Sequence, residues 1–131
     1  QTQRSWMRRK TMLNTNLNHI ESDNELHKTL EENENVMVTC GREGPMCLPV
    51  YDVMENLEDK YNHVAFRDMS FDGPAAHNIK SLPQTRGFTG LPFVVYFKNG
   101  EVVAATTSIQ TKHQVKEILD RQFGHPSERA A

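Results

Sequence analysis

Along residues 17–123 of this chain, segments with the hydrophobic pattern of a β-strand alternate with segments with the pattern of an α-helix. Short apolar runs rich in β-branched and aromatic residues predict buried strands at residues 17–20, 36–39, 63–69, 92–97 and 101–104. Helices are expected in the intervening and following segments, residues 22–33, 47–61, 72–82 and 111–123. The predicted order of elements is therefore β-α-β-α-β-α-β-β-α.

Local signals mark where three of these helices begin. Ser22 with Glu25, and Thr111 with Gln114, have the spacing of a capping box, in which the two side chains satisfy free N–H groups of the first turn. Asp72 is expected to cap the helix between them, since Pro74 follows it closely. These signals fix the helix boundaries more firmly than periodicity alone does.

The two strands at residues 92–97 and 101–104 flank Asn99-Gly100, the preferred pair for a type I′ turn. They should therefore form an antiparallel hairpin. The earlier strands alternate with helices, an arrangement typical of parallel pairing. Together these features predict an α/β fold with a central mixed sheet, helices on both faces, and a C-terminal hairpin followed by a helix.

The chain has 131 residues, a length that suits a single domain with its own core. A domain is expected at residues 17–124, between a disordered leader at residues 1–16 and a flexible tail at residues 125–131. The leader holds the one basic cluster, Arg4, Arg8, Arg9 and Lys10. Because no apolar run approaches the ~20 residues of a membrane span, no membrane partner is expected, and a cytoplasmic location is predicted.

Composition argues against several classes of function. The chain carries 15 basic and 17 acidic residues, and it lacks interleaved basic and aromatic residues, so no nucleic-acid partner is expected. Its six histidines show no metal-ligand spacing with either cysteine, and no glycine-rich phosphate loop is present. No metal and no cofactor are therefore predicted.

Three segments resemble thioredoxin over residues 17–123: Gly44-Pro45-Met46-Cys47 at the start of a helix, Gly90-Leu91-Pro92 before a strand, and Lys98-Asn99-Gly100 in the hairpin. The resemblance implies a thioredoxin fold. It also implies a cis peptide bond at Leu91-Pro92, and a groove beside that bond which docks an extended segment of a protein substrate. The substrate-binding residues carried over are Gly44, Pro45, Met46, Leu91 and Pro92.

The chain departs from the thioredoxin pattern where the chemistry should be. Cys47 matches the second, buried cysteine of the family, whereas Gly44 stands in place of the first, which is the nucleophile. Val38 stands where the family has a buried aspartate that accepts a proton. These departures weaken the case for the disulfide-exchange activity that the resemblance implies.

Cys40, seven residues before Cys47, is the second cysteine of the chain. Cys40 should end a strand and Cys47 should begin the next helix, so the two are expected near the same end of the sheet. A disulfide requires Cα atoms about 4.4–6.8 Å apart. A disulfide between Cys40 and Cys47 is therefore expected to be possible without a large rearrangement, and both are candidate catalytic residues. The helix start favours thiolate at Cys47 and the loop favours access at Cys40, so the attacking thiol stays open.

Three functions are compatible with these residues. The first is a thiol–disulfide oxidoreductase that acts on protein disulfides through Cys40 and Cys47. The second is a non-catalytic module that keeps the groove and binds an extended segment of a client protein. The third is a peroxide-reactive protein in which Cys47 forms a sulfenic acid that Cys40 resolves.

Overall fold

A computed structural model describes residues 13–126. The strands are β1 (Asn18–His19), β2 (Asn35–Gly41), β3 (Ala65–Ser70), β4 (Phe93–Lys98) and β5 (Glu101–Thr107). The helices are α2 (Asp23–Glu32), α3 (Leu48–Leu57), α4 (His77–Lys80) and α5 (Lys112–Phe123), with a 3-10 turn at Pro83–Thr85. The order of elements agrees with the prediction, and the 3-10 turn is the one addition.

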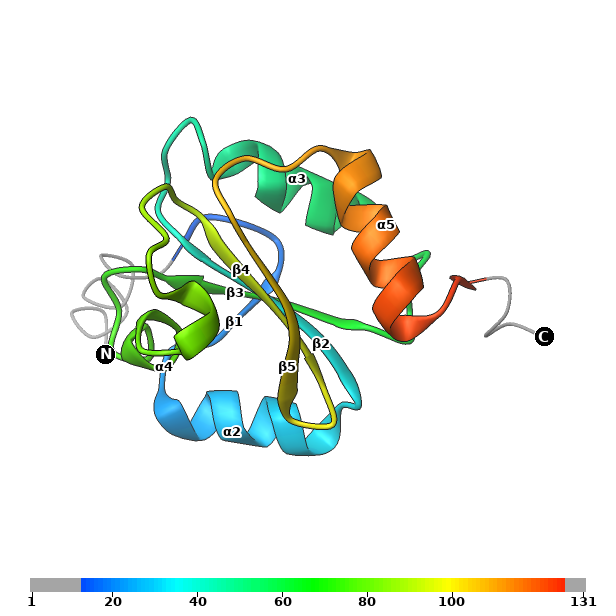
Figure 1. Cartoon of the computed structure of the whole chain (residues 1–131), viewed down its shortest axis with the longest axis horizontal. Coiled ribbons are helices and arrows are strands. Elements are labelled where there is room, and N and C mark those ends of the chain that lie inside the picture. The colour runs from blue at the N-terminus through cyan, green and yellow to red at the C-terminus, as the bar shows by residue number, and fades with distance from the viewer. Residues whose placement is uncertain (1–12, 127–131) are drawn as a thin grey trace.

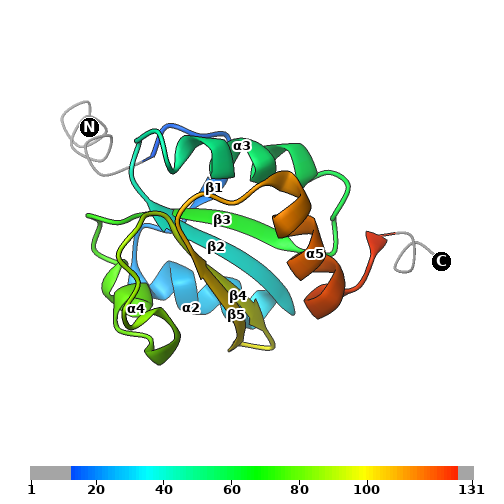
Figure 2. The same ribbon diagram turned by 45° about the horizontal axis from the view of Figure 1, so that its top comes forward.

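One mixed sheet forms the centre of the domain, with strand order β1-β3-β2-β4-β5. Strand β3 pairs in parallel with both β1 and β2, whereas β4 is antiparallel to β2 and to β5. Helices α3 and α5 cover one face, and α2 and α4 cover the other (Figure 1; Figure 2). The predicted mixed sheet with helices on both faces is confirmed.

Each face of the sheet has its own apolar cluster, because side chains alternate between the two faces along every strand. Along β2, Met37 packs in the cluster under α3 and α5. Its neighbours Val36 and Val38 pack in the cluster under α2 and α4. This alternation decides where the cysteines lie.

The two capping-box signals are confirmed, one of them in an altered form. Thr111 and Gln114 form both halves of a capping box at the start of α5. Ser22 accepts from the Glu25 N–H at 3.1 Å, but the Glu25 carboxylate turns to the Glu21 N–H at 2.6 Å. Helix α2 therefore begins where the sequence predicts, with the second half of its box shifted by one residue.

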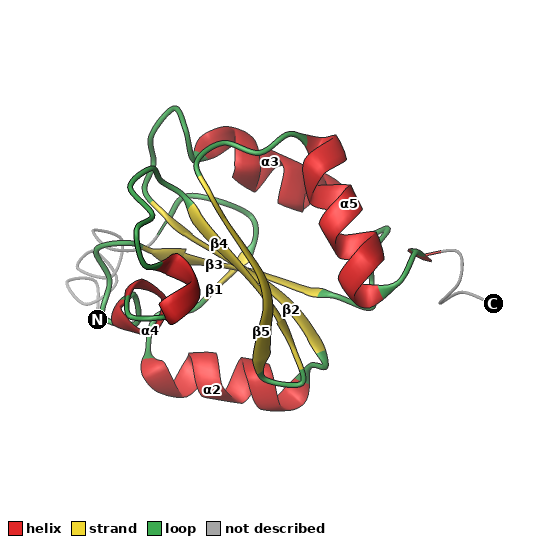
Figure 3. Ribbon diagram, viewed as in Figure 1, coloured by secondary structure: helices red, strands yellow, loops and turns green. Residues whose placement is uncertain are grey.

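The hairpin turn also follows the prediction. A short turn joins β4 to β5 (Figure 3). Its residues Asn99 and Gly100 have φ angles of 54° and 81°, the positive values that a type I′ turn needs at both central positions. The Asn99 N–H donates to the Glu34 carbonyl at 2.8 Å, which ties the turn to the end of α2.

Asp72 does not cap a helix, which corrects the prediction. Helix α4 begins only at His77, with Ala76 at its N-cap, so Asp72 lies four residues too early. Its carboxylate instead accepts two hydrogen bonds from the Arg42 guanidinium, both of 2.8 Å. Asp72 therefore binds the guanidinium group of Arg42 instead of the free N–H groups at the start of α4.

The predicted leader ends earlier than residue 16. Leu13 is buried in the cluster beneath α3, and the Thr15 hydroxyl donates to the Asp68 carboxylate. The Asn16 N–H donates to Glu55 of α3 at 2.9 Å. Residues 13–16 therefore belong to the domain, because the Leu13 side chain and these two hydrogen bonds anchor them. The rest of the predicted leader and the end of the predicted tail lie outside the described residues.

Candidate functional site

Cys47 is the N-cap residue of α3. Helix α3 begins at the end of the sheet where the loops before β4 and after β5 also lie (Figure 1; Figure 3). The turn before it is closed by the Gly44 carbonyl, which accepts from the Cys47 N–H at 3.1 Å and from the Leu48 N–H at 3.0 Å. Pro45 and Met46, the two residues inside this turn, are exposed. The two central residues of the turn thus face solvent, whereas the thiol of Cys47 faces the interior.

Gly41 allows Cys47 and Pro92 to approach the same point of β2. A Cβ atom built on Gly41 would lie 2.8 Å from the Cys47 Sγ and 3.1 Å from the Pro92 Cβ. It would also lie 2.7 Å from the Tyr51 Oη. The Leu91–Pro92 peptide bond is cis. The helix-start thiol and the proline loop are therefore adjacent, as the resemblance implies.

The Cys47 thiol is buried and hydrogen-bonded. Its exposed fraction is 2%, and its Sγ accepts from the Arg42 backbone N–H at 3.4 Å. The Tyr51 hydroxyl donates to the Arg42 carbonyl at 3.1 Å. Burial, and then the nearby Cys47 thiol, raise the pKa of the Tyr51 hydroxyl, so Tyr51 stays a neutral donor. Both backbone groups of Arg42 are thus engaged around the thiol.

Cys40 lies on the other face of the sheet. It packs with Val36 and Val38 in the cluster under α2 and α4, with an exposed fraction of 0%. Desolvation raises the pKa of the Cys40 thiol to about 12, against a smaller opposing effect of Lys80. Cys40 therefore remains an un-ionised, inaccessible thiol at neutral pH.

The two thiols are both free, and they belong to different core clusters. Gly41, the residue after Cys40, faces Cys47, so Cys40 faces away from it. The expectation that Cys40 and Cys47 can join without a large rearrangement is wrong, because the backbone of β2 lies between their side chains. Pairing would require Cys40 to leave its cluster and β2 to turn over.

Asp68 is a buried carboxylate that sequence reasoning missed. Its exposed side-chain fraction is 0%, and it hydrogen-bonds with Thr15 and with His19 Nδ1. Desolvation raises the pKa of the Asp68 carboxyl, and the contacts with Thr15 and His19 partly oppose that rise. Asp68 pairs in register with Thr39 and anchors the residues before β1. Strand position alone would have indicated its burial, since Asp68 lies two residues after the core residue Phe66.

Exposed apolar side chains gather around the Cys47 end of the sheet. Among the described residues, the large exposed apolar side chains are Met46, Leu48 and Ile109, with exposed fractions of 44%, 45% and 46%. Ile109 follows Ser108, whose N–H donates to the Gly90 and Pro92 carbonyls at 3.2 and 3.1 Å. We call these three side chains the apolar rim. Exposed apolar side chains at this end of the sheet are candidates for contact with a partner.

Leu91 offers unused backbone hydrogen-bonding groups beside this rim. Within residues 13–126, neither its N–H nor its carbonyl has a hydrogen-bond partner, and the residue is only partly buried. An exposed N–H and carbonyl at the end of a strand can pair with an added extended chain. Leu91 and Pro92 therefore have the form that docking requires, while their role in binding stays a prediction.

Charged residues flank the site on two sides. Arg42 forms its two-pronged ion pair with Asp72, which lowers the pKa of the Asp72 carboxyl. Glu43 accepts from the Asn14 N–H at 2.9 Å. Arg42 and Glu43 are thus held by specific partners rather than simply solvated, and these adjacent residues bring opposite charges to the loop before Gly44.

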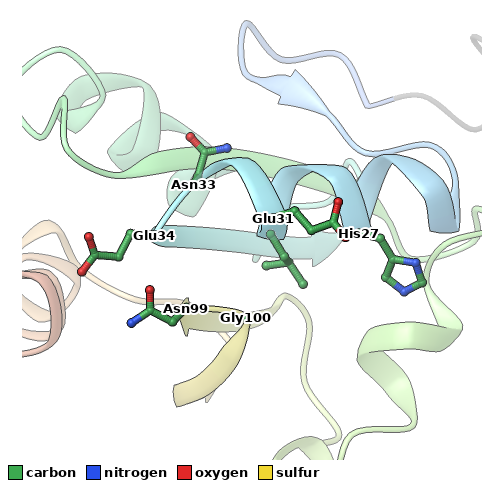
Figure 4. A pocket seen from close by; sticks show the side chains of 7 residues that line it. His27, Glu31, Asn33, Glu34, Asn99 and Gly100 are labelled. Carbon is green, nitrogen blue, oxygen red and sulfur yellow. The ribbon is translucent and has the colours of Figure 1, made fainter.

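A separate cleft of about 550 Å³ lies at the other end of the sheet. Its walls come from the end of α2, with His27, Glu31 and Glu34, and from the hairpin turn at Asn99 (Figure 4). None of the predicted site residues lines it. We assign no function to it, because acidic side chains around an open cleft are not in themselves a binding site.

Two further findings limit the chemistry. Across residues 13–126, no three His, Cys, Asp or Glu side chains converge as metal ligands. No helix in that same part of the chain has the length and apolar character needed to cross a membrane.

Solved structures resemble this domain closely in fold. A thioredoxin from Plasmodium falciparum superposes with a TM-score of 0.67 at 19% identity, covering 81% of this chain and 99% of its own. Thioredoxin from Fasciola hepatica gives 0.63 at 20% identity, covering 80% and 98%. Thioredoxin from Malassezia sympodialis gives 0.65 at 18% identity, covering 84% and 93%.

Neither the family models nor the curated proteins give a match to this sequence. The structural likeness therefore establishes the thioredoxin fold, as the sequence predicts, and it establishes this for nearly the full length of the proteins compared. At such low identity the likeness says nothing about activity, which has to be argued from the site itself.

Proposed function

We propose that this chain is a non-catalytic binding module of thioredoxin fold that holds an extended segment of a client protein beside Leu91–Pro92. The proposal rests on two features found together: the docking edge is retained, and the sheet separates the two thiols, so that they cannot act as a pair. The edge consists of the unpaired Leu91 backbone groups next to the cis-proline. The thiols of Cys40 and Cys47 face opposite sides of the sheet.

The apolar rim supports binding at this edge. An extended segment that pairs with the Leu91 N–H and carbonyl would present alternate side chains to this end of the sheet, where the apolar rim lies. Burying one such side chain of Leu or Met size stabilises a complex by about 1.5–3 kcal/mol, before the cost of ordering the segment. Hydrogen bonds to the Leu91 backbone would then fix the register of the docked segment, and contacts with the apolar rim would supply most of its affinity.

The dithiol oxidoreductase, the first hypothesis from the sequence, has weaker support. Exchange needs an accessible thiolate and a second thiol within bonding reach. Gly44 supplies no thiol at the accessible position, and Cys40 is buried with its pKa raised to about 12. The same burial weakens the peroxide hypothesis, because Cys40 could not resolve a sulfenic acid at Cys47.

Peptide selection tests the binding proposal. A library of random peptides displayed on phage is panned on the full chain, and the affinity of selected peptides is measured by fluorescence anisotropy. Ile109→Asp places a charge in the exposed rim, and we expect it to weaken binding at least tenfold. Asn24→Asp, which adds the same charge at an exposed position of α2, is the matched control and should leave affinity unchanged.

Two further arms separate binding from exchange. Cys47→Ser should bind the selected peptides within threefold of wild type, because no covalent bond to the client is involved. Wild type should not accelerate the reduction of insulin by dithiothreitol. The proposal fails if no peptide is selected, if Ile109→Asp binds as wild type does, or if wild type accelerates insulin reduction.

A further inference from the structure

A cationic aromatic cluster lies beside the proposed docking edge. Phe71, in the turn after β3, packs edge-to-face on Phe93 with ring centroids 5.4 Å apart. Phe93 is the residue that follows Pro92, and Phe88 packs on its ring in the same way at 5.5 Å. Phe71 is partly exposed, and Leu91 packs against the same apolar cluster as Phe71 and Phe93, so the aromatic cluster lies next to the Leu91 end of the docking edge.

Two cations lie on the Phe71 ring. The Lys80 Nζ is 4.1 Å from the ring centroid, and the Arg42 Cζ is 5.1 Å from it. Positions within about 6 Å of a ring face are favourable for a cation. Lys80 comes from α4 and Arg42 from the loop before α3, so the ring gathers charge from two separate elements.

These two cations differ in how far they are neutralised. Arg42 already has a two-pronged partner in Asp72. Lys80 is exposed, and within residues 13–126 no carboxylate lies within ion-pair distance of it. Asp72, the partner of Arg42, also attracts Lys80 from beyond ion-pair distance and lies in the same group of charges. Two cations then face one carboxylate, so this group of side chains keeps a net positive charge.

The loop before Cys47 also contributes a negative charge. Glu43 precedes Gly44, and its carboxylate accepts from the Asn14 N–H instead of pairing with Lys80. A docked segment would thus meet a cation at Lys80 and, in that loop, an anion at Glu43. This asymmetry would favour one orientation of the segment and one charge pattern within it.

We propose that Lys80, seated on Phe71, is a subsite for an aspartate or glutamate side chain of the docked segment. The inference rests on the proposed binding function and narrows its partner to an extended segment with an apolar anchor and an acidic neighbour. A strand advances about 3.3 Å per residue. The Lys80 Nζ is 4.1 Å from the Phe71 ring centroid, which is 5.4 Å from the Phe93 ring centroid. These distances correspond to at most about three residues of a strand. We therefore expect the acidic residue one to three positions from the residue that pairs with Leu91.

Peptide selection with variants at position 80 tests this subsite. Pools panned on wild type should be enriched in Asp or Glu at one position beside the apolar anchor. Pools panned on Lys80→Glu should lose that enrichment and gain Lys or Arg there. In a selected peptide, replacing the acidic residue by its amide should weaken binding to wild type about fivefold, the scale of an exposed ion pair. The same replacement should have no effect on binding to Lys80→Gln.

Lys28→Gln is the matched control, since Lys28 is an exposed lysine on α2. It should respond to the peptide replacement as wild type does. Peptides that bind, and that lose affinity on Ile109→Asp, but show no acidic preference would overturn the subsite and leave the binding function standing. An equal effect of Lys28→Gln and Lys80→Gln would also overturn it, since the preference would then reflect overall charge. Failure to select any peptide would overturn both proposals.

Discussion

Gly44→Cys should convert this binding site into a working disulfide exchange site. The Gly44 carbonyl accepts from the Cys47 N–H at 3.1 Å, which is the closing bond of a four-residue turn. Such a turn brings its end Cα atoms within about 7 Å, close to the 4.4–6.8 Å that a disulfide spans. A Cβ atom added to Gly44 meets no atom within 4 Å, so the new side chain fits without displacing a neighbour.

The size of the gain follows from thiol chemistry at a helix start. A pKa lowered from about 8.5 to about 6.5 would raise the thiolate fraction at pH 7 from about 3% to about 75%. Lower intrinsic nucleophilicity removes much of that advantage. Rapid resolution of the mixed disulfide by Cys47 restores it, so we expect insulin reduction roughly tenfold above that of wild type. Closing so short a loop should stabilise the oxidised variant by about 2 kcal/mol over its reduced form.

The assay is insulin turbidity in dithiothreitol, run on wild type, Gly44→Cys, and Gly44→Cys combined with Cys47→Ser. Only the single variant should exceed the background rate. Mass spectrometry of its oxidised form should show a disulfide between positions 44 and 47. If that disulfide does not form in folded protein, the described turn geometry is wrong. If the disulfide forms but insulin reduction stays at background, the site lacks the docking edge that we assign to it.

Three further predictions follow from the packing around the sheet. Gly41→Ala should lower the free energy of unfolding by about 1–3 kcal/mol in urea, because its Cβ would lie 2.7 Å from the Tyr51 Oη. Gly44→Ala, with open space around it, should change that free energy by less than about 0.5 kcal/mol, and equal effects would refute the close approach. Cys40 should resist alkylation in folded protein up to pH 9, because burial raises its pKa to about 12, and rapid labelling would contradict its placement. Burial raises the pKa of the Asp68 carboxyl above 3.8, so the folded state binds more protons than the unfolded state between these pKa values. Wild type should therefore gain stability relative to Asp68→Asn as the pH falls from 7 towards 4 in a series of urea titrations, and parallel curves would contradict this.

Local sequence signals predicted most of the fold. The Asn99-Gly100 turn and the Thr111 capping box were identified correctly because each is decided by neighbouring residues alone. The proline loop was placed beside Cys47 through resemblance to thioredoxin, and the contacts of Gly41 agree with it. The glycine at position 41, which has no Cβ atom, is itself a signal of close approach that sequence reasoning did not use.

Features that depend on contacts across the fold were missed. Asp72 looked like a helix cap, but Arg42, thirty residues away in sequence, binds it instead. Residues 13–16 looked like part of a polar leader, but Leu13 fills the core and Thr15 binds Asp68. Neither outcome could be predicted without knowing which segments meet.

The side of the sheet that Cys40 faces could have been predicted. Alternation along a strand puts Cys40 with Val36 and Val38, and the residue that faces the opposite side there is Gly41. What the sequence did not reveal is the face that Cys47 joins, since that depends on how α3 packs. The distance in sequence between two cysteines was therefore a poor guide to their pairing.

Oxidation of the native protein tests the central claim most directly. The folded chain is treated with diamide and monitored by NMR to verify that it stays folded. It is then alkylated, digested without reduction and analysed by mass spectrometry. We predict that no peptide pair joined through Cys40 and Cys47 appears. A Cys40–Cys47 disulfide formed in protein that keeps its native spectrum would contradict the placement of these thiols on opposite faces of the sheet.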